Sequence, residues 1–304
     1  NSEMGVNFNS DLYVSEFTKD NANINRNLYR LQPNFNYKTN GIKINLGLNI
    51  VGDLDQSLSK NPVNWYPNIQ IDYRAMPSLN LYGGIKGNTY FNSLGSMSFE
   101  LPWLGKDIEL RNTREIVHIF AGLKGSEDKG LSYEFKLAYS NLENLSFFTP
   151  SMADTSQFEI LYSGNETQKT GIFNLSGNID YQVNPTYKTN LKFIFNNYSK
   201  LSSLEQPYSR PKFNLEFTNQ YQFRKSITIS PNLYYISGLY GYRPNVGPVK
   251  MKSIVDLNLK LDYSVNEKIN TYLSMNNLLG TKYQRYINYQ VQGLNLTIGA
   301  SYTF

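Results

Sequence analysis

The last eleven residues, Leu294 to Phe304 (LNLTIGASYTF), decide the fold class. Every second residue is apolar, and the residues between them are polar or Gly. This period of two is typical of a β-strand with one apolar and one polar face, because successive side chains of a strand point to opposite sides. The stretch ends on a bare aromatic residue, whereas soluble domains commonly fray into a polar tail. It therefore predicts a strand that packs to its last residue and turns its apolar face to lipid.

The same alternation recurs along the whole chain. Between Ile42 and Ile50, apolar residues alternate with Lys43, Asn45, Gly47 and Asn49. A helical period of 3.6 residues is not visible over any long window, so the chain is predicted to be all-β. Similar runs occupy residues 4–14, 29–37, 69–74, 79–87, 117–123, 131–139, 173–181, 191–196, 213–223, 227–235, 255–263 and 269–275.

Short and long connections alternate between these runs. Short turns are expected at 39–41, 76–78, 126–130, 184–186, 224–225 and 266–268. Longer loops are expected at 16–26, 53–65, 92–113, 142–156, 199–210, 238–251 and 279–290. Short turns on one rim and long loops on the other are typical of an outer-membrane β-barrel. We therefore predict one transmembrane domain over residues 1–304, an antiparallel up-and-down barrel of about 14 strands with short periplasmic turns and long extracellular loops.

Residues 157–183 fit this strand count least well. We interpret them as one long strand with an irregularity between Gly164 and Gly171. A separate extracellular hairpin is the alternative. Pro231 has no N–H for the strand ladder, so we expect a bulge there.

Composition excludes several classes of protein. The 304 residues carry a net charge of +5 and no Cys. No apolar run approaches the roughly 18 residues of a membrane-spanning helix, and the absence of Cys excludes a disulfide scaffold and thiolate metal sites. The basic residues are scattered, so nucleic acid is not an expected partner. A soluble β-sandwich is disfavoured because Tyr and Phe gather near the strand ends, as in the aromatic girdles of membrane proteins.

Residues 253–304 resemble the end of TonB-dependent receptor barrels, especially those of the Bacteroidota. The matching pieces are Ile254–Leu259 (IVDLNL), Asn276–Tyr283 (NNLLGTKY) and Gly293 at the entry to the closing strand. The resemblance implies an integral outer-membrane location and a C-terminal signal, Tyr302 and Phe304, that is read by the barrel-assembly machinery. The chain departs from the family in the Gln292-Gly293-Leu294 entry, and it contains no plug domain and no energy-coupling box.

Receptor barrels of this family have about 22 strands. An open arc of 14 strands would leave two unpaired edges in lipid, where each unsatisfied backbone group costs several kcal/mol. We therefore expect a self-contained barrel that closes by pairing its last strand with its first.

The polar positions of the alternation are expected to line the lumen. Acidic and basic residues are nearly balanced there, and several lie two residues apart, which predicts a lumen crosslinked by ion pairs rather than a selective ring of one charge. The predicted lumen-lining residues are Lys43, Asp72, Arg74, Lys86, His118, Glu134, Lys136, Asp180, Lys192, Glu216, Asp256, Lys260 and Asp262.

No catalytic, cofactor-binding or metal-binding motif is present, so the chain is not expected to be an enzyme. The single His118 has no Ser-containing elbow motif near it. The glycines of Tyr82–Gly87 (YGGIKG) precede no helix and therefore form no phosphate loop. They are expected to permit bending or close packing on a curved strand.

Aromatic residues in the long loops are the candidate ligand or partner contacts, because exposed apolar clusters often mark such surfaces. Folding inward to cap the barrel is the alternative for the same residues. The candidates are Phe99, Trp103, Phe147, Phe148, Tyr240, Tyr242 and Arg243.

Two functions follow from these patterns. The first is passage or uptake of a solute across the outer membrane, since about 14 strands leave room for a lumen. The alternative is a non-transporting subunit or scaffold of a larger outer-membrane complex, for surface-protein assembly, secretion or nutrient uptake. The expected partners are outer-membrane lipids, lipopolysaccharide and the barrel-assembly machinery, with surface lipoproteins or another barrel added under the alternative.

Overall fold

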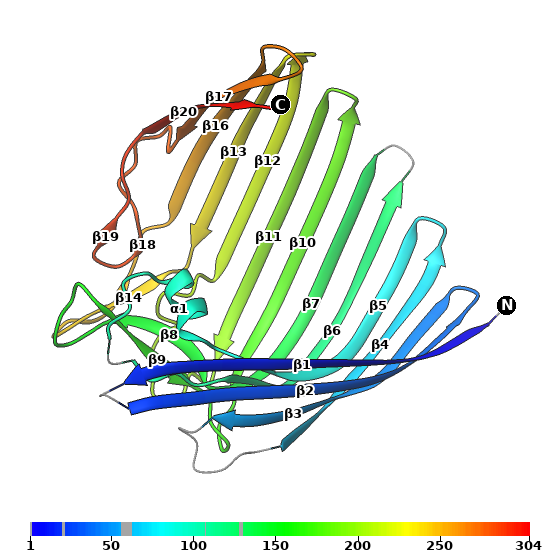
Figure 1. Ribbon diagram of the computed structural model, residues 1–304, viewed down its shortest axis with the longest axis vertical. Helices are drawn as coiled ribbons and strands as arrows, with labels where there is room; N and C mark the ends of the chain where they lie inside the picture. The colour runs from blue at the N-terminus through cyan, green and yellow to red at the C-terminus, as the bar shows by residue number, and fades with distance from the viewer. Residues whose placement is uncertain (1, 20–21, 56–62, 107, 128–129) are drawn as a thin grey trace. The chain divides into compact units, whose positions relative to one another are not determined.

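The computed structural model describes residues 2–19, 22–55, 63–106, 108–127 and 130–304. Most of these residues belong to one 14-stranded sheet whose strand order follows the chain (Figure 1). Its strands are β1 (Glu3–Lys19), β2 (Ala22–Thr39), β3 (Ile42–Asp55), β4 (Val63–Met76), β5 (Leu79–Tyr90), β6 (Thr113–Glu127), β7 (Leu131–Glu143), β10 (Thr170–Asn184), β11 (Tyr187–Ser199), β12 (Phe213–Arg224), β13 (Ile227–Ser237), β16 (Ile254–Ser264), β17 (Ile269–Asn276) and β20 (Asn295–Tyr302). The predictions of an all-β chain and of 14 strands are confirmed.

Three connections carry a small hairpin of their own. These are β8 (Leu145–Pro150) with β9 (Phe158–Ser163), β14 (Tyr240–Arg243) with β15 (Gly247–Lys250), and β18 (Gln284–Tyr286) with β19 (Tyr289–Gln290). The connection after β5 contains α1 (Leu94–Glu100), which Ser93 caps by accepting from the N–H of Ser96. Within the described ranges, no helix is both long and apolar enough to cross a membrane.

The protein divides into two compact units. Unit 1 comprises Asn1–Leu123, Leu137–Phe173 and Asn197–Pro207, and unit 2 comprises Lys124–Lys136, Asn174–Asn196 and Tyr208–Phe304. The strand order begins with β1 and ends with β20. Pairing between β20 and β1, which would close the sheet, stays a prediction.

The register of β3 on β4 shows how unit 1 separates its two faces. Apolar residues lie opposite apolar residues on one face: Ile42 opposite Tyr73, Leu46 opposite Ile69, and Ile50 opposite Trp65. On the other face Lys43 lies opposite Asp72, Asn45 opposite Gln70, and Asn49 opposite Tyr66. Cross-strand partners share a face, so the alternation predicted from the sequence is maintained across neighbouring strands.

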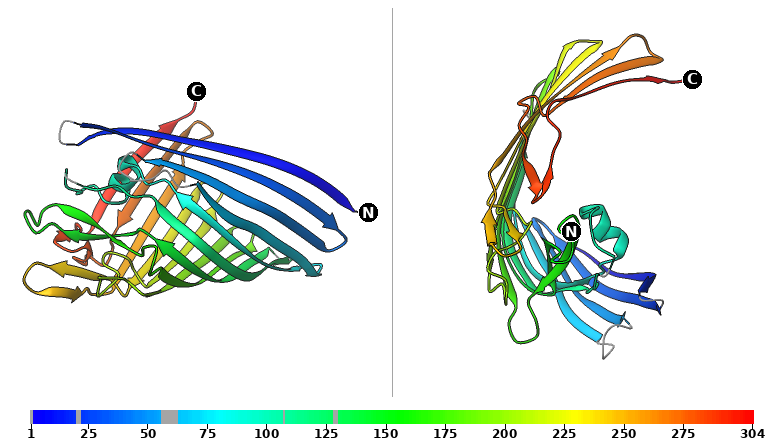
Figure 2. Two further views of the ribbon diagram at one scale, coloured as in Figure 1. Left: turned by 90° about the horizontal axis from the view of Figure 1, so that it is seen from below. Right: turned by 90° about the vertical axis from the view of Figure 1, so that its left-hand side faces the viewer.

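The C-terminal strands of unit 2 follow the same rule. Figure 2 shows β16, β17 and β20 side by side, in orange to red. Leu296 lies opposite Met275, Ile298 opposite Leu273, and Tyr302 opposite Ile269. Ile298 is 81% exposed. The apolar face of β20 is therefore bare, as its sequence predicted.

Three local predictions are wrong. The long loop expected at 16–26 is wrong for residues 16–19 and 22–26, which are paired strands whose register continues to Lys19 opposite Ala22, and residues 20–21 lie outside the described residues. Residues 157–183 are two strands, β9 in a side hairpin and β10 in the main sheet, so the alternative interpretation was correct. Of the expected loop at 53–65, residues 53–55 belong to β3 and 63–65 to β4, and residues 56–62 lie outside the described residues. The short turn expected at 126–130 likewise includes residues 128–129, which lie outside the described part.

A fourth local prediction that is wrong is the bulge expected at Pro231. Pro231 lies opposite Leu259 in the regular register of β13 on β16, and the register shift of the other pair, β12 with β13, falls between Gln222 and Arg224. Amide side chains hold β12 against β13 beside the proline, since Oδ1 of Asn232 accepts from the N–H of Asn219 at 3.3 Å. Nδ2 of Asn219 donates to the carbonyl of Pro231 at 3.3 Å. An amide side chain thus keeps the register where proline would otherwise interrupt it.

Glycine in β5 allows two strands and a ring to approach closely. A Cβ at Gly84 would lie 2.3 Å from the carbonyl oxygen of Ile69 and 2.9 Å from the ring of Phe120. The ring of Phe120 is buried in a small cluster with Tyr82 and Ala138. The close packing predicted for the Tyr82–Gly87 glycines is therefore confirmed at Gly84.

Candidate functional site

A row of polar side chains crosses four neighbouring strands of unit 2. Lys192 lies opposite Glu216, Glu216 opposite Tyr234, and Tyr234 opposite Asp256. Since directly opposite residues share a face, the row places three of the predicted lumen-lining residues together. Whether that face lines a lumen stays a prediction.

The predicted ion pairs are found in part. Nζ of Lys260 lies 2.6 Å from Oδ1 of Asp262. Asp72 accepts from Nε2 of Gln70 at 2.9 Å, and Arg74 donates to the carbonyl of Pro77 at 3.2 Å. The remaining predicted lumen residues are distributed over five strands, with Lys43 on β3, Lys86 on β5, His118 on β6, Glu134 and Lys136 on β7, and Asp180 on β10.

Polar residues of unit 2 line a hollow of about 510 Å³, and most of them carry amide or hydroxyl side chains. Asn190, Asn219 and Asn232 line it together with Asp180. Nδ2 of Asn190 donates to Oδ1 of Asp180 at 2.9 Å, which fixes the orientation of that amide. Such a surface offers both donors and acceptors, so it suits the passage of a hydrated polar solute.

His118 belongs to a polar cluster whose members do not follow the regular alternation of strand faces. Its Nδ1 lies 2.7 Å from Oγ of Ser140 and 3.0 Å from Oε1 of Glu115. Oγ of Ser140 and the phenol of Tyr90 each donate to Glu115 at 2.8 Å. Residues three apart in a regular strand face opposite sides, so β6 departs from strict alternation between Glu115 and His118.

The geometry of this cluster differs from that of a catalytic triad. In a triad the serine and the carboxylate contact different nitrogens of the imidazole, which allows proton transfer along the chain of groups. Here Ser140 and Glu115 both meet Nδ1 of His118. The arrangement therefore fixes the histidine ring but does not activate the serine. In the part of the chain that the structure describes, no group of three His, Asp or Glu side chains is placed to hold a metal ion.

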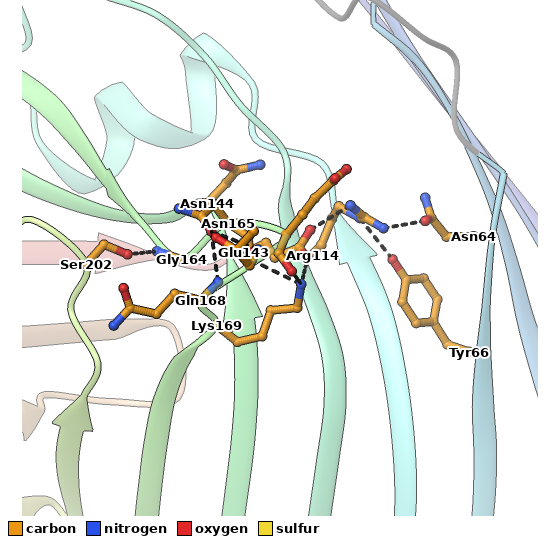
Figure 3. A network of polar contacts seen from close by, with 12 residues as sticks. Asn64, Tyr66, Arg114, Glu143, Asn144, Gly164, Asn165, Gln168, Lys169 and Ser202 are labelled. Atoms are coloured by element: carbon orange, nitrogen blue, oxygen red, sulfur yellow. Dashed lines mark hydrogen bonds and ion pairs between the residues drawn. The ribbon is translucent and has the colours of Figure 1, made fainter.

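A polar network closes the loop end of unit 1 around Glu143, which is 5% exposed (Figure 3). Nη1 of Arg114 donates to Oε2 of Glu143 at 2.6 Å, and Nζ of Lys169 pairs with Oε1. Arg114 also donates to Oδ1 of Asn64. The carboxylate thus joins β4, β6 and β7 to the segment that leads into β10.

The same network reaches the following loop through main-chain contacts. The N–H of Asn144 donates to the carbonyl of Gly164 at 3.0 Å, and the N–H of Gly164 donates to Oγ of Ser202 at 3.0 Å. Lys169 donates to the carbonyl of Glu166 at 2.7 Å. The connection from β9 to β10 is therefore held by hydrogen bonds on both sides.

A second buried layer of unit 1 was missed by the sequence analysis. Arg26, 1% exposed, donates to Oδ1 of Asn112 at 2.9 Å and lies over the ring of Phe91 at 5.4 Å. Nδ2 of Asn112 donates to both oxygens of Asp53 at 3.0 Å. All three polar residues stand in segments that were predicted to be loops, and no sequence motif joins them.

The candidate loop residues divide into exposed and buried groups. Phe99 is 93% exposed and Trp103 is 38% exposed. Phe147 and Phe148 are 0% exposed, so the prediction that they form a contact surface is wrong. In the β8–β9 hairpin, Phe147 lies opposite Leu161 and Phe148 opposite Ile160, and Phe147 also contacts the ring of Tyr198 edge-on. In unit 2, Arg243 is exposed, and the ring of Tyr242 packs edge-on against Tyr208 at 5.6 Å.

The proposed assembly residues lie at the free end of β20. Tyr302 is 55% exposed and contacts the ring of Phe304 edge-on, with centroids 5.2 Å apart. Phe304 is fully exposed. Both aromatic rings are thus available to lipid or to a protein, and their role as a signal stays a prediction.

Together these features define a class of fold: a wide antiparallel sheet in sequential order, with one bare apolar face, one polar face and elaborate connections at one end of the strands. Solved structures of this class are similar to the chain along its whole length. No family model matches the sequence, and no curated protein matches it.

The similar solved structures are outer-membrane receptors. A ferric enterobactin receptor of Pseudomonas aeruginosa superposes with a TM-score of 0.72 at 11% identity, over 100% of this chain and 52% of its own. The ferric-catecholate import receptor Fiu of Escherichia coli K12 gives 0.67 at 14% identity, over 100% and 52%. The FpvAI–pyocin S2 complex gives 0.70 at 12% identity, over 99% and 44%. At these identities the likeness shows the fold alone, and the chain spans about half the length of the receptors it matches.

Proposed function

We propose that this chain forms the wall of a transmembrane β-barrel in a bacterial outer membrane and takes part in the uptake of a solute. The observation that carries the proposal is the separation of the two faces of the sheet. One face presents exposed apolar side chains strand after strand, and the other presents paired polar and charged side chains.

The exposed apolar face is the strongest argument for a membrane. On β4 alone, Trp65 is 65% exposed, Ile71 48% and Tyr73 48%. Soluble monomers rarely expose contiguous apolar patches larger than a few hundred Å². A lipid bilayer solvates such a face, and the resulting alternation is that of a membrane barrel strand.

Closure of the sheet is part of this proposal. A free strand edge in lipid leaves unpaired N–H and C=O groups, each costing several kcal/mol. Pairing of β20 with β1, or with further strands, would satisfy those groups.

Uptake is favoured by the fold likeness and by the polar face. The similar structures include an import receptor and receptors for ferric enterobactin and pyoverdine. The amide-lined hollow of unit 2 supplies a surface that a polar solute can contact. A TonB-dependent mode of transport, as the C-terminal resemblance implies, is included in the proposal. The proposal draws three further points from the sequence resemblance alone. These are a source among the Bacteroidota, an assembly signal at Tyr302 and Phe304, and partners beyond lipid and lipopolysaccharide.

The lipid-facing surface can be tested with the two tryptophans of the chain. The Trp103→Phe variant keeps Trp65, which lies on the apolar face, as its single tryptophan. Reconstituted into vesicles that contain brominated phospholipid, this variant is expected to show strong quenching of its fluorescence. The matched Trp65→Phe variant, which keeps only Trp103 in the connection after β5, is expected to be quenched weakly.

Equal quenching of the two variants would contradict the assignment of the apolar face. Solute passage is tested separately by recording the full chain in planar bilayers. Stepwise conductance or saturable solute flux is expected. A tight barrel without either, isolated with stoichiometric partner proteins in mild detergent, would favour the scaffold function instead.

A further inference from the structure

Two side hairpins of unit 2 pack together beside a cavity. The β14–β15 hairpin follows β13, and the β18–β19 hairpin follows β17, so both lie on connections at the same end of their antiparallel strands. Ile287, 2% exposed, sits directly on Gly241, where an added Cβ would be 2.8 Å from the isoleucine side chain. Between these hairpins is a cavity of about 310 Å³.

Four positively charged side chains line this cavity. Arg243 and Lys250 come from the β14–β15 hairpin, Lys252 from the segment that follows it, and Lys282 from the segment that enters β18. All four are exposed. Among the residues that line the cavity, all within the described part of the chain, none is Asp or Glu.

Neighbouring basic residues of unit 2 have partners, whereas these four have none among the described residues. Nη1 of Arg285 donates to the carbonyl of Ser209 at 3.0 Å, and its guanidinium lies over the ring of Tyr286. Lys260 pairs with Asp262. The cations of the cavity therefore repel one another, and a bound anion would relieve that repulsion.

The polar wall of the cavity is held in place by the strand behind it. The phenol of Tyr283 donates to Oδ2 of Asp256 at 2.6 Å. Burial and this hydrogen bond raise the pKa of Tyr283, so the phenol remains neutral and adds no negative charge to the wall. The N–H of Val291 donates to the carbonyl of Tyr283 at 2.9 Å, which closes the base of the β18–β19 hairpin.

We propose that this cavity binds a small anion that carries several negative charges on phosphate or carboxylate groups. Lysine and arginine are the residues that recognise both groups, by charge and by charge-assisted hydrogen bonds. The cavity volume lies at the lower end of the range for small-molecule sites, which fits a compact ligand. The identification of this anion as the transported solute rests on the proposed function, whereas its binding does not.

The test is calorimetric titration of the full chain in detergent at low salt, with inorganic pyrophosphate and citrate as probes. The wild-type protein is expected to bind at least one of them. The Lys250→Gln, Lys252→Gln double variant is expected to bind about tenfold more weakly, because each exposed charge contributes only a modest factor. Both substitutions are at exposed positions, and heat-modifiable gel mobility checks that the variant is folded.

The matched control removes two lysines at the other end of the same strands, with Lys225→Gln in the β12–β13 turn and Lys268→Gln in the β16–β17 turn. This control has the same net charge as the test variant and is expected to bind like the wild type. Absence of binding by both probes, or equal weakening in the two variants, would overturn the proposal. Phosphate can also be carried by lipopolysaccharide, so a competition arm adds it to the pyrophosphate complex. Displacement identifies a lipid source for the anion, and its absence identifies a soluble one.

Failure of this titration is distinguishable from failure of the proposed function. The bromolipid experiment on Trp65 reports on the lipid-facing wall whether or not the cavity binds an anion. If the protein passes that test and binds neither probe, the assignment of the lipid-facing wall stands and only the anion site is refuted.

Discussion

Neutralising Glu143 is expected to loosen the connection between β9 and β10 while leaving the main sheet in place. The Glu143→Gln substitution keeps the shape of the side chain but removes its charge and replaces one of its two acceptor oxygens with an NH2 donor. Two cations, Arg114 and Lys169, then lose the carboxylate that they share. Lys169 lies at the end of the connection, so its release frees residues 164–169 first.

The magnitude follows from the burial of the three groups. Breaking a buried ion pair by removing one partner costs about 3–5 kcal/mol. The side chains of Arg114 and Lys169 are 21% and 28% exposed. Water therefore compensates part of the loss, and we expect a local cost of about 2 kcal/mol. That value corresponds to opening of the segment about 30-fold more often.

Hydrogen exchange followed by mass spectrometry measures this opening directly, on peptides that cover residues 164–170. Glu205→Gln is the matched control, because Glu205 is an exposed acid in the neighbouring loop of the same unit. Exchange about 30-fold faster in Glu143→Gln and unchanged in the control is the expected pattern. Equal exchange rates in wild type and Glu143→Gln would show that the carboxylate does not hold the connection.

Two further predictions concern unit 2. The pKa of Tyr283 is raised in the folded protein. Its contribution to the free energy of unfolding is therefore fully present below the ordinary tyrosine pKa of about 10, and it is lost as the pH rises from there through the raised pKa. Thermal unfolding should therefore be less sensitive to alkaline pH in Tyr283→Phe than in wild type, and identical slopes would refute the assignment. Deletion of Tyr302–Phe304 should lower the amount of heat-modifiable, folded protein in the membrane fraction. The loss should exceed what the burial free energy of one aromatic ring, about 2–3 kcal/mol, would cause. Thr303→Ser should leave the amount of folded protein nearly unchanged. Normal accumulation of the truncated protein would exclude a role for this end in assembly.

The strands of the main sheet were predictable because one physical requirement acts on all of them. Each strand must present one apolar and one polar face, and that requirement appears directly as a period of two, as in Ile42–Ile50 and Leu294–Phe304. The connections obey no such period. Arg26 of β2 and Asp53 of β3 meet Asn112 of the connection before β6 only in the folded protein, so their partnership depends on contacts between distant segments.

The errors in detail have the same origin. Phe147 and Phe148 are apolar residues in a connection, and the sequence alone does not say whether the folded connection will bury them, as it does here. A bulge was expected at Pro231 because the sequence does not show which residue of the neighbouring strand lies beside it. In the structure, Asn232 accepts a hydrogen bond from Asn219 of that neighbouring strand. Of the predicted lumen residues, the register brings Lys192, Glu216 and Asp256 into one row, which alternation on single strands cannot specify.

The three side hairpins have an evolutionary consequence. Each of β8–β9, β14–β15 and β18–β19 forms its own two-stranded sheet, while the main sheet keeps the strand order of the chain around it. Insertion, loss or exchange of a hairpin would therefore change the outer contacts of the molecule without shifting the register of any wall strand. In sequences descended from this one, the connections can change quickly and with them what the protein recognises. The strands of the main sheet change slowly, because each must keep one apolar and one polar face.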